Sequence, residues 1–168
     1  MPPPVLLDYS QIDFSRPIYD IEAIRRVNPQ RNQMEHLTAV VWEDTTQNAV
    51  IGYKDITENE FWVPGHMPGF PLMPGVIMCE AAAQLAGFYA QKHKLLGGDF
   101  VGFGGMDDIR FRGPVFPNSR LILLAKMKEL KPRRLATFDF QGIVNDKMIF
   151  TGSMIGVPIS RTQNPPST

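Results

Sequence analysis

The sequence predicts an α+β domain in which a curved, mostly antiparallel sheet of about six strands wraps around one long helix. Three observations lead to this expectation. Residues 76–96 are long, free of proline, rich in alanine and apolar on most faces. Six shorter runs have the composition of β-strands, and polar turns join them into hairpins. Because a helix that is apolar nearly all round must be enclosed, we expect the strands to curve around it.

The N-terminal third is expected to hold an arm, a short helix and the first hairpin. Residues 1–18 mix prolines with scattered apolar positions, which indicates an arm lying over the body or over a partner. Asp20 can cap a helix over residues 21–27, which stops before Asn28-Pro29 because the residue before a proline avoids the helical region. Strands over residues 37–43 and 49–56 follow, separated by a polar turn.

The long helix is expected to end at Gly97-Gly98, after basic side chains that suit the C-terminal end of the helix dipole. Four strand candidates come next, over residues 100–111, 121–130, 135–144 and 147–157. Residues 161–168 have the composition of a disordered tail. No repeat or linker divides the chain, so we expect one domain over residues 1–168.

Composition excludes several classes of protein. Lys plus Arg and Asp plus Glu are both 17, so the whole-molecule field gives no reason to expect nucleic acid or an anionic membrane as a partner. No apolar run approaches the roughly 20 residues that cross a bilayer, and we expect a cytoplasmic protein without membrane insertion.

The single cysteine, Cys79, is interpreted as a core residue. No metal or nucleotide motif stands out, and His36 and His93 are interpreted as structural.

His66 lies between two groups of glycines and prolines, in Gly65-His66-Met67-Pro68-Gly69 and ahead of Pro74-Gly75. These residues restrict the backbone or let another chain approach closely, so the imidazole is held in a fixed and crowded loop. Such a loop suits a general base. The alternative is a loop histidine that only satisfies its ring nitrogens on nearby backbone.

Glu80 is the only acid between Glu60 and Asp99, and it lies one turn into the most apolar helix of the chain. A carboxylate is costly to bury there, so we expect Glu80 to be protonated and able to donate. The alternative is an acid that points outward near the helix N-terminus, where the dipole favours it. Gln84 lies one turn further on and can hydrogen-bond the Glu80 side chain, and Phe88 lies a turn beyond Gln84.

The start of the helix supplies a third element. The backbone amides of Gly75 and Val76 have no acceptor within the helix and can donate to an oxygen that gains negative charge. A base, an acid and amide donors together suit removal of a proton next to a carbonyl and loss of a β-hydroxyl as water.

These motifs together resemble the β-hydroxyacyl-acyl carrier protein dehydratases of the FabZ type, which have the hotdog fold. The matching segments are His66-Met67-Pro68-Gly69, Met73-Pro74-Gly75-Val76 and Glu80-Ala81-Ala82-Ala83-Gln84. They are similar to the family's His-Phe-Pro-Gly, Pro-Gly-Val and Glu-Ala-x-Ala-Gln motifs at the family's spacing. Residues 105–111, with the prolines that follow, resemble the family's strand after the helix, so the resemblance spans about residues 21–158.

The resemblance implies dehydration of (3R)-3-hydroxyacyl thioesters of acyl carrier protein to trans-2-enoyl thioesters in fatty-acid biosynthesis. It implies that His66 is the general base, that Glu80 is the general acid oriented by Gln84, and that the amides of Gly75 and Val76 hold the thioester oxygen. It also implies a homodimer in which His66 of one subunit works with Glu80 of the other, with further assembly into a trimer of dimers in some members. No cofactor is implied beyond the phosphopantetheine arm that carries the substrate.

Other positions have roles that follow from the resemblance alone. The substrate tunnel is expected to include Met67, Phe70 and Phe88. Basic residues are candidates for contact with the acidic carrier protein, with a solvated edge as the alternative interpretation; they are Arg110, Arg112, Arg120, Arg133 and Arg134. The chain departs from the family at Met67, where phenylalanine is usual, and over residues 29–37.

Two other functions are compatible with the same fold. A hotdog thioesterase also places a carboxylate on the central helix and uses amides at its start, but it has no need for His66. A non-catalytic acyl-binding or assembly subunit is the third alternative, against which the presence of both His66 and Glu80 argues.

Overall fold

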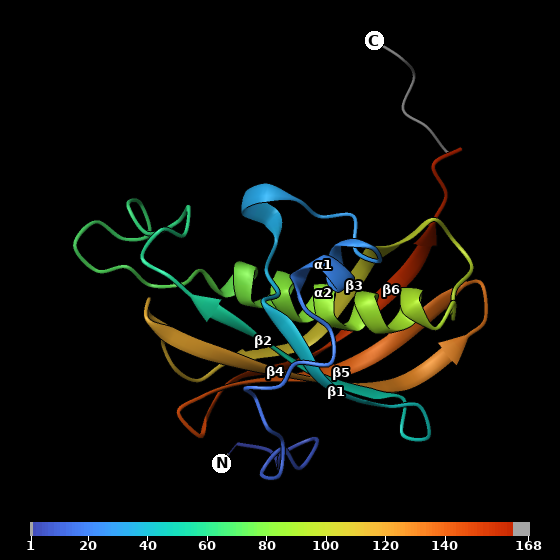
Figure 1. Cartoon of the computed structure of the whole chain (residues 1–168), viewed down its shortest axis with the longest axis horizontal. Helices are drawn as coiled ribbons and strands as arrows, with labels where there is room; N and C mark the ends of the chain where they lie inside the picture. The colour runs from blue at the N-terminus through green and yellow to red at the C-terminus, as the bar shows by residue number, and fades with distance from the viewer. Residues whose placement is uncertain (1, 163–168) are drawn as a thin grey trace.

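The computed structural model describes residues 2–162, which contain one long helix, α2 (Gly75–Lys92), and a six-stranded sheet (Figure 1). The strands are β1 (Ala39–Asp44), β2 (Ala49–Ile56), β3 (Phe100–Phe111), β4 (Ser119–Lys131), β5 (Leu135–Val144) and β6 (Lys147–Ile159). They lie in the order β1-β2-β4-β5-β6-β3, and every neighbouring pair is antiparallel. The predicted α+β arrangement is therefore confirmed. The predicted tail lies outside the described residues from residue 163 onward.

The sheet curves around α2, which lies along its concave face (Figure 1). The strand pairing is interrupted by register shifts at five places, two of them in β3, near Phe103 and near Asp107. Such bulges bend a strand and increase its twist, which lets a sheet of long strands wrap a helix. The core lies between the two layers, where the buried side chains of Leu85, Phe88 and Tyr89 meet those of β4, β5 and β6.

The helix boundaries differ from the predicted ones. Helix α1 (Ile21–Arg25) is capped by Asp20, as expected, but ends two residues early. Helix α2 ends at Lys92 because Lys94 adopts the left-handed conformation, with φ of 54°. The amide of the next residue, Leu95, then donates to the Ala90 carbonyl at 2.9 Å, which is the hydrogen bond that closes a Schellman motif. Lys94 therefore ends the helix, a few residues before Gly97-Gly98, where the sequence predicted the end.

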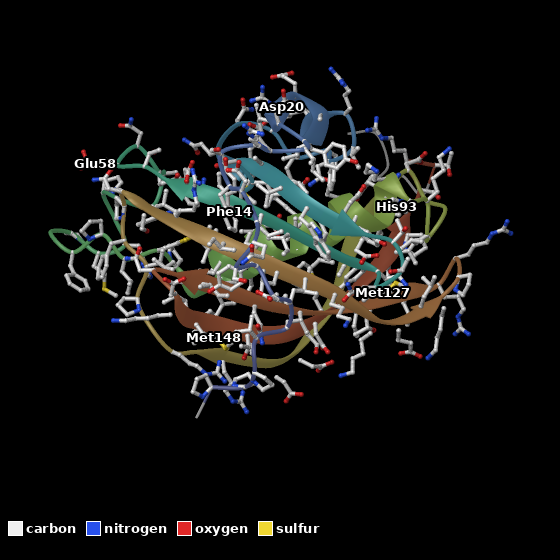
Figure 2. The ribbon with its side chains drawn as sticks, turned by 60° about the horizontal axis from the view of Figure 1, so that its bottom comes forward. Phe14, Asp20, Glu58, His93, Met127 and Met148 are labelled. Atoms are coloured by element: carbon white, nitrogen blue, oxygen red, sulfur yellow. The ribbon has the colours of Figure 1, made fainter. Side chains whose placement is uncertain are left out.

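The N-terminal arm lies over the outer face of this chain's own sheet, which decides between the two placements left open by the sequence (Figure 2). Leu7 is buried against the outward side chains of β1, β2, β4 and β5, and Phe14 packs on Tyr53 with ring centroids 6.2 Å apart. Gln141 holds the arm with both ends of its side chain. It accepts from the Leu6 amide at 2.8 Å and donates to the Pro4 carbonyl at 2.9 Å.

Three further features of residues 2–162 bear on the sequence analysis. Cys79 is buried in the core, and burial raises the pKa of its thiol to about 11. A short 3-10 segment, η1 (Asn32–Met34), precedes β1 and was not predicted. No helix in this part of the chain is both long and apolar enough to cross a membrane.

Candidate active site

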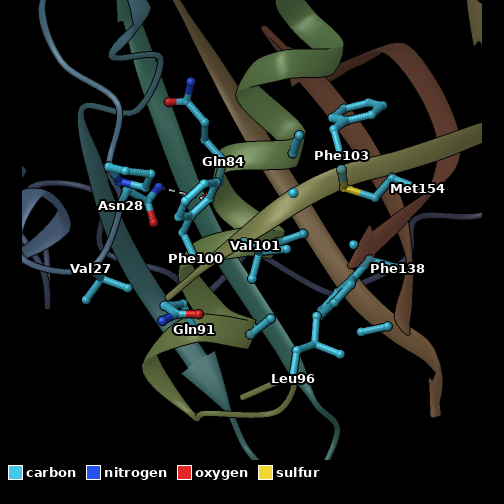
Figure 3. Close-up of a pocket in the computed structure, with 18 of the residues that line it drawn as sticks. Val27, Asn28, Gln84, Gln91, Leu96, Phe100, Val101, Phe103, Phe138 and Met154 are labelled. Atoms are coloured by element: carbon cyan, nitrogen blue, oxygen red, sulfur yellow. Dashed lines mark hydrogen bonds between the residues drawn. The ribbon is translucent and has the colours of Figure 1, made fainter. Parts of the chain in front are cut away.

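A cavity of about 250 Å³ lies between α2, the start of β3 and the loop of residues 27–30 (Figure 3). Helix α2 contributes one face to it, which carries Glu80, Ala83, Gln84, Gly87, Ala90 and Gln91. Val101, Phe138 and Met154 form the opposite wall. Apolar surface with a few polar groups at one place is the usual character of a site for a small organic ligand.

The side chain of Glu80 lines this cavity and accepts a hydrogen bond from Gln84. The Gln84 Nε2 donates to Glu80 Oε1 at 2.8 Å and to the Met34 carbonyl at 2.7 Å, while its Oε1 accepts from the His36 amide at 2.9 Å. These three partners fix which end of the Gln84 amide is oxygen and which is nitrogen. Gln84 is only 4% exposed, so its hydrogen bonds are sheltered from water. The sequence predicted the contact between Gln84 and Glu80, and the structure contains it.

His66 lies in the connection between β2 and α2, and hydrogen bonds hold it on two sides. Its amide donates to the carbonyl of the buried Trp62 at 2.8 Å, and its carbonyl accepts from the Leu72 amide at 2.8 Å. The ring Nδ1 lies 2.7 Å from the Leu72 carbonyl oxygen. Because that oxygen can only accept, Nδ1 carries the proton of the neutral ring and Nε2 keeps a free lone pair. This arrangement leaves Nε2 able to accept a proton.

The first turn of α2 begins at Gly75 and has no side-chain cap. Ile77 and Met78 are the first residues whose amides donate to Pro74, at 3.0 and 3.2 Å, so the amides of Gly75 and Val76 precede the helical ladder. A Cβ at Gly75 would lie 2.6 Å from the Phe111 ring, so a larger residue at the helix start would have to displace that exposed side chain.

The structure brings Glu80 and Gln84 together but does not add every predicted tunnel residue to them. His66, Met67 and Phe70 do not line the cavity of a single chain, and the last two are 50% and 56% exposed. Phe88 is buried in the core against Tyr19, with ring centroids 5.3 Å apart. Each step of four residues turns about 40° past a full helical turn, so Phe88 has rotated off the face of Glu80 by about 80°.

The sequence interpretation missed the residues that continue the cavity along α2. These are Ala83, Gly87 and Ala90, which follow Glu80 by three, seven and ten residues. Their common feature was visible in the sequence, since small side chains recur at helical spacing on the side of the acid. Asn28 was missed as well; its Nδ2 donates to the Gln84 carbonyl at 3.0 Å and ties the loop of residues 27–30 to α2.

The five arginines predicted to contact a carrier protein do not form one patch. Arg120 is engaged within the chain, because it binds both carboxylate oxygens of Asp55 and stacks over Tyr53 at 3.9 Å. Arg112 donates to Thr151 at 2.8 Å. Arg133 and Arg134 are exposed in the turn between β4 and β5, whereas Arg110 lies near the far end of β3.

Comparison with known proteins connects this geometry to a family. The model of the FabA-like domain family matches residues 28–153. The chain is 32% identical over 145 residues, or 86% of its length, to the bifunctional enzyme LpxC/FabZ of Chlorobaculum tepidum. It spans 31% of that curated relative.

Solved structures show the same fold at low sequence identity. The dehydratase heterocomplex ApeI:P from Xenorhabdus doucetiae matches with a TM-score of 0.70 and 16% identity, over 83% of this chain and 92% of that one. Cj0977, a sigma28-regulated virulence protein from Campylobacter jejuni, matches with a TM-score of 0.59 and 17% identity, over 84% and 94%. The predicted hotdog fold is thereby confirmed.

Proposed function

Since this chain belongs to the FabA-like domain family, we propose that it dehydrates (3R)-3-hydroxyacyl thioesters to trans-2-enoyl thioesters. The observation that carries the proposal is the position of Glu80. Within residues 2–162 it is the only carboxyl group that lines the cavity, and the buried Gln84 side chain holds it there. A hotdog thioesterase with a carboxylate on the central helix would have no need for a histidine in this loop, whereas His66 is held by three hydrogen bonds, none of which uses Nε2 among the described residues.

In the proposed reaction the thioester oxygen accepts hydrogen bonds from the amides of Gly75 and Val76. Nε2 of His66 removes a proton from C2, and the electron pair of that bond forms the C2–C3 double bond. The bond from C3 to the hydroxyl oxygen breaks, and Glu80 gives its proton to the leaving hydroxyl, which departs as water. Exchange with solvent then removes the proton from His66 and returns one to Glu80, so that no net proton is gained or lost.

We infer that two copies of the chain build each site. In one chain, His66 is absent from the cavity that holds Glu80, so a histidine from a second copy supplies the base. Apolar side chains exposed around the His66 loop, the start of α2 and the edge strand β3 support such a contact; they are Met67, Phe70, Val76, Phe103 and Phe111.

In the proposed reaction the substrate arrives on the phosphopantetheine of an acyl carrier protein. Further assembly of the dimers into a trimer of dimers stays a prediction.

The first test compares His66→Ala and Glu80→Gln with the unchanged protein by following enoyl thioester absorbance. We expect each substitution to lower the rate by about 10²- to 10⁴-fold, the usual contribution of a general acid or base. Glu58→Gln is the matched control, because Glu58 is exposed and bonds only to Asn118 among the described residues. Release of free thiol without enoyl product would overturn the proposal in favour of thioester hydrolysis.

A mixing experiment tests whether the site is shared. When His66→Ala and Glu80→Gln chains are unfolded together and refolded, a mixed dimer keeps one site with both residues intact. Random pairing makes half of the dimers mixed, so about a quarter of the unmixed activity is expected to return. If the two residues act within one chain, every site keeps a defect and the mixture stays inactive.

A further inference from the structure

Gly87 occupies a helix position that favours other residues. It lies in the middle of α2, where glycine lowers helix stability relative to alanine. Its φ is not positive, unlike those of Gly69 and Gly97. A Cβ at Gly87 would meet only the Cβ of Val101, at 3.8 Å, which is an ordinary contact. Neither the backbone conformation nor crowding therefore requires a glycine here.

What distinguishes position 87 is the space in front of it. Gly87 faces the cavity with Ala83 and Ala90, and the three form a stripe of small residues that starts beside Glu80. Val101 and Phe138 stand across the cavity from α2 (Figure 3), and Leu96 and Ala90 also line it. Leu96 and Phe138 are each 2% exposed, so residues of the core form this part of the cavity wall. A larger side chain at position 87 would fill the middle of the cavity.

We propose that Gly87 determines how long an acyl chain the cavity accepts. The inference rests on the proposed function and names its substrate as an apolar acyl group whose tail reaches past position 87. Gly87 lies seven residues beyond Glu80, which is about 10 Å along the helix axis. An extended chain advances about 1.2 Å per bond. When C3 is beside Glu80, carbons about eight or nine bonds further on therefore lie beside Gly87. Shorter chains end before reaching it.

The test uses pantetheine thioesters with acyl chains of about 4, 8 and 14 carbons. We would measure kcat/KM for the 3-hydroxyacyl forms, and Kd by calorimetry for saturated forms that cannot react. For Gly87→Leu, the longest chain is expected to lose at least about 10-fold in both measurements, because a single extra methylene in an apolar pocket already changes discrimination by about 10- to 200-fold. The shortest chain is expected to change less than about twofold. Gly87→Ala should raise the thermal midpoint and show a smaller shift of the same kind.

Two further variants separate cavity filling from general damage. Gly105→Ala is the matched control, because its Cβ would make an ordinary 3.6 Å contact with Ile155 outside the cavity lining. Val101→Ala, combined with Gly87→Leu, returns volume on the facing wall and should restore part of the binding of the long chain. An equal loss at every chain length, or an unchanged profile, would overturn the inference. If the unchanged protein dehydrates no thioester, the proposed function fails, while the calorimetric series still decides the role of Gly87.

Discussion

His36 is fully buried, and neither of its ring nitrogens has a hydrogen-bond partner in the described part of the chain. Its amide donates to Gln84, so it lies directly behind the residue that holds Glu80. Burial lowers the pKa of the His36 ring to about 4, and the positive charge of Lys54 adds to this effect while Glu60 opposes it. The ring is therefore neutral near pH 7.

A pH dependence of stability follows from His36. The unfolded chain has an ordinary histidine pKa of about 6.5, so it binds a proton before the folded chain does as the pH falls. Above about pH 6.5 the ring is uncharged in both the folded and the unfolded chain, and His36 does not lower the free energy of unfolding. As the pH falls toward 4, only the unfolded chain takes up the proton, and the free energy of unfolding decreases by on the order of 3 kcal/mol. Urea denaturation at about pH 7 and pH 4.5 should show a smaller decrease for His36→Leu than for the unchanged chain. Equal decreases would contradict this assignment.

At the scale of single residues, the sequence was informative where the chemistry needs a particular residue type. His66, Glu80 and Gln84 could be singled out because their types and spacing are unusual in so apolar a context. The helical spacing of Ala83, Gly87 and Ala90 was visible in the sequence, but it could not show whether these small residues face a cavity or pack against a neighbouring element. His36 was interpreted as structural, but its contact with Gln84 depends on a long-range approach that no local pattern encodes.

Among the elements, the connection of residues 57–74 depends on a buried ion pair. Lys54 Nζ on β2 lies 3.0 Å from Glu60 Oε1, and the two side chains are only 8% and 11% exposed. Two residues after Glu60, the buried Trp62 provides the carbonyl that accepts from His66. The pair thus helps to fix the first part of the loop that carries the proposed base.

Removing one partner of this pair should cost much more than removing an exposed charge. Lys54→Met leaves Glu60 buried without its partner, so we expect the free energy of unfolding to fall by about 3–5 kcal/mol. Lys131→Met is the control, since the pair of Lys131 with Glu129 is about half exposed and should contribute about 1 kcal/mol or less. Chemical denaturation measures both. In Lys54→Met/Glu60→Leu most of the stability should return, and a double variant as unstable as the single one would contradict the explanation.

The elements themselves were predictable to different degrees. Strands β5 and β6 were found because a tight turn and alternating apolar residues mark them locally. The end of α2 was misplaced because a lysine adopts the left-handed conformation that glycine usually supplies. The register shifts that curve the sheet depend on contacts between strands, and a single sequence does not display them.

In the whole molecule, the sheet separates two apolar regions. The concave face holds α2 and the cavity, and the outer face is covered by the N-terminal arm (Figures 1 and 2). The sequence did not show whether the arm lies on a partner or on its own chain, because the apolar residues of the arm have no regular period. In the structure, the arm buries outward-facing side chains of the sheet such as Ile51 and Leu124.

This separation predicts that damage to the arm lowers stability without changing catalysis. Leu7 is 6% exposed, so Leu7→Asp places an unpaired charge in the outer cluster and should lower the free energy of unfolding by about 3 kcal/mol or more. Val5→Asp makes a similar change two residues away, where the side chain is 50% exposed, and should have little effect. Because the cavity lies beyond the sheet, kcat/KM per folded molecule and the preference for chain length should stay the same in both variants. A changed preference for chain length in Leu7→Asp would contradict this prediction, because it would show that the sheet transmits a change in the arm to α2 and that the two apolar regions are coupled.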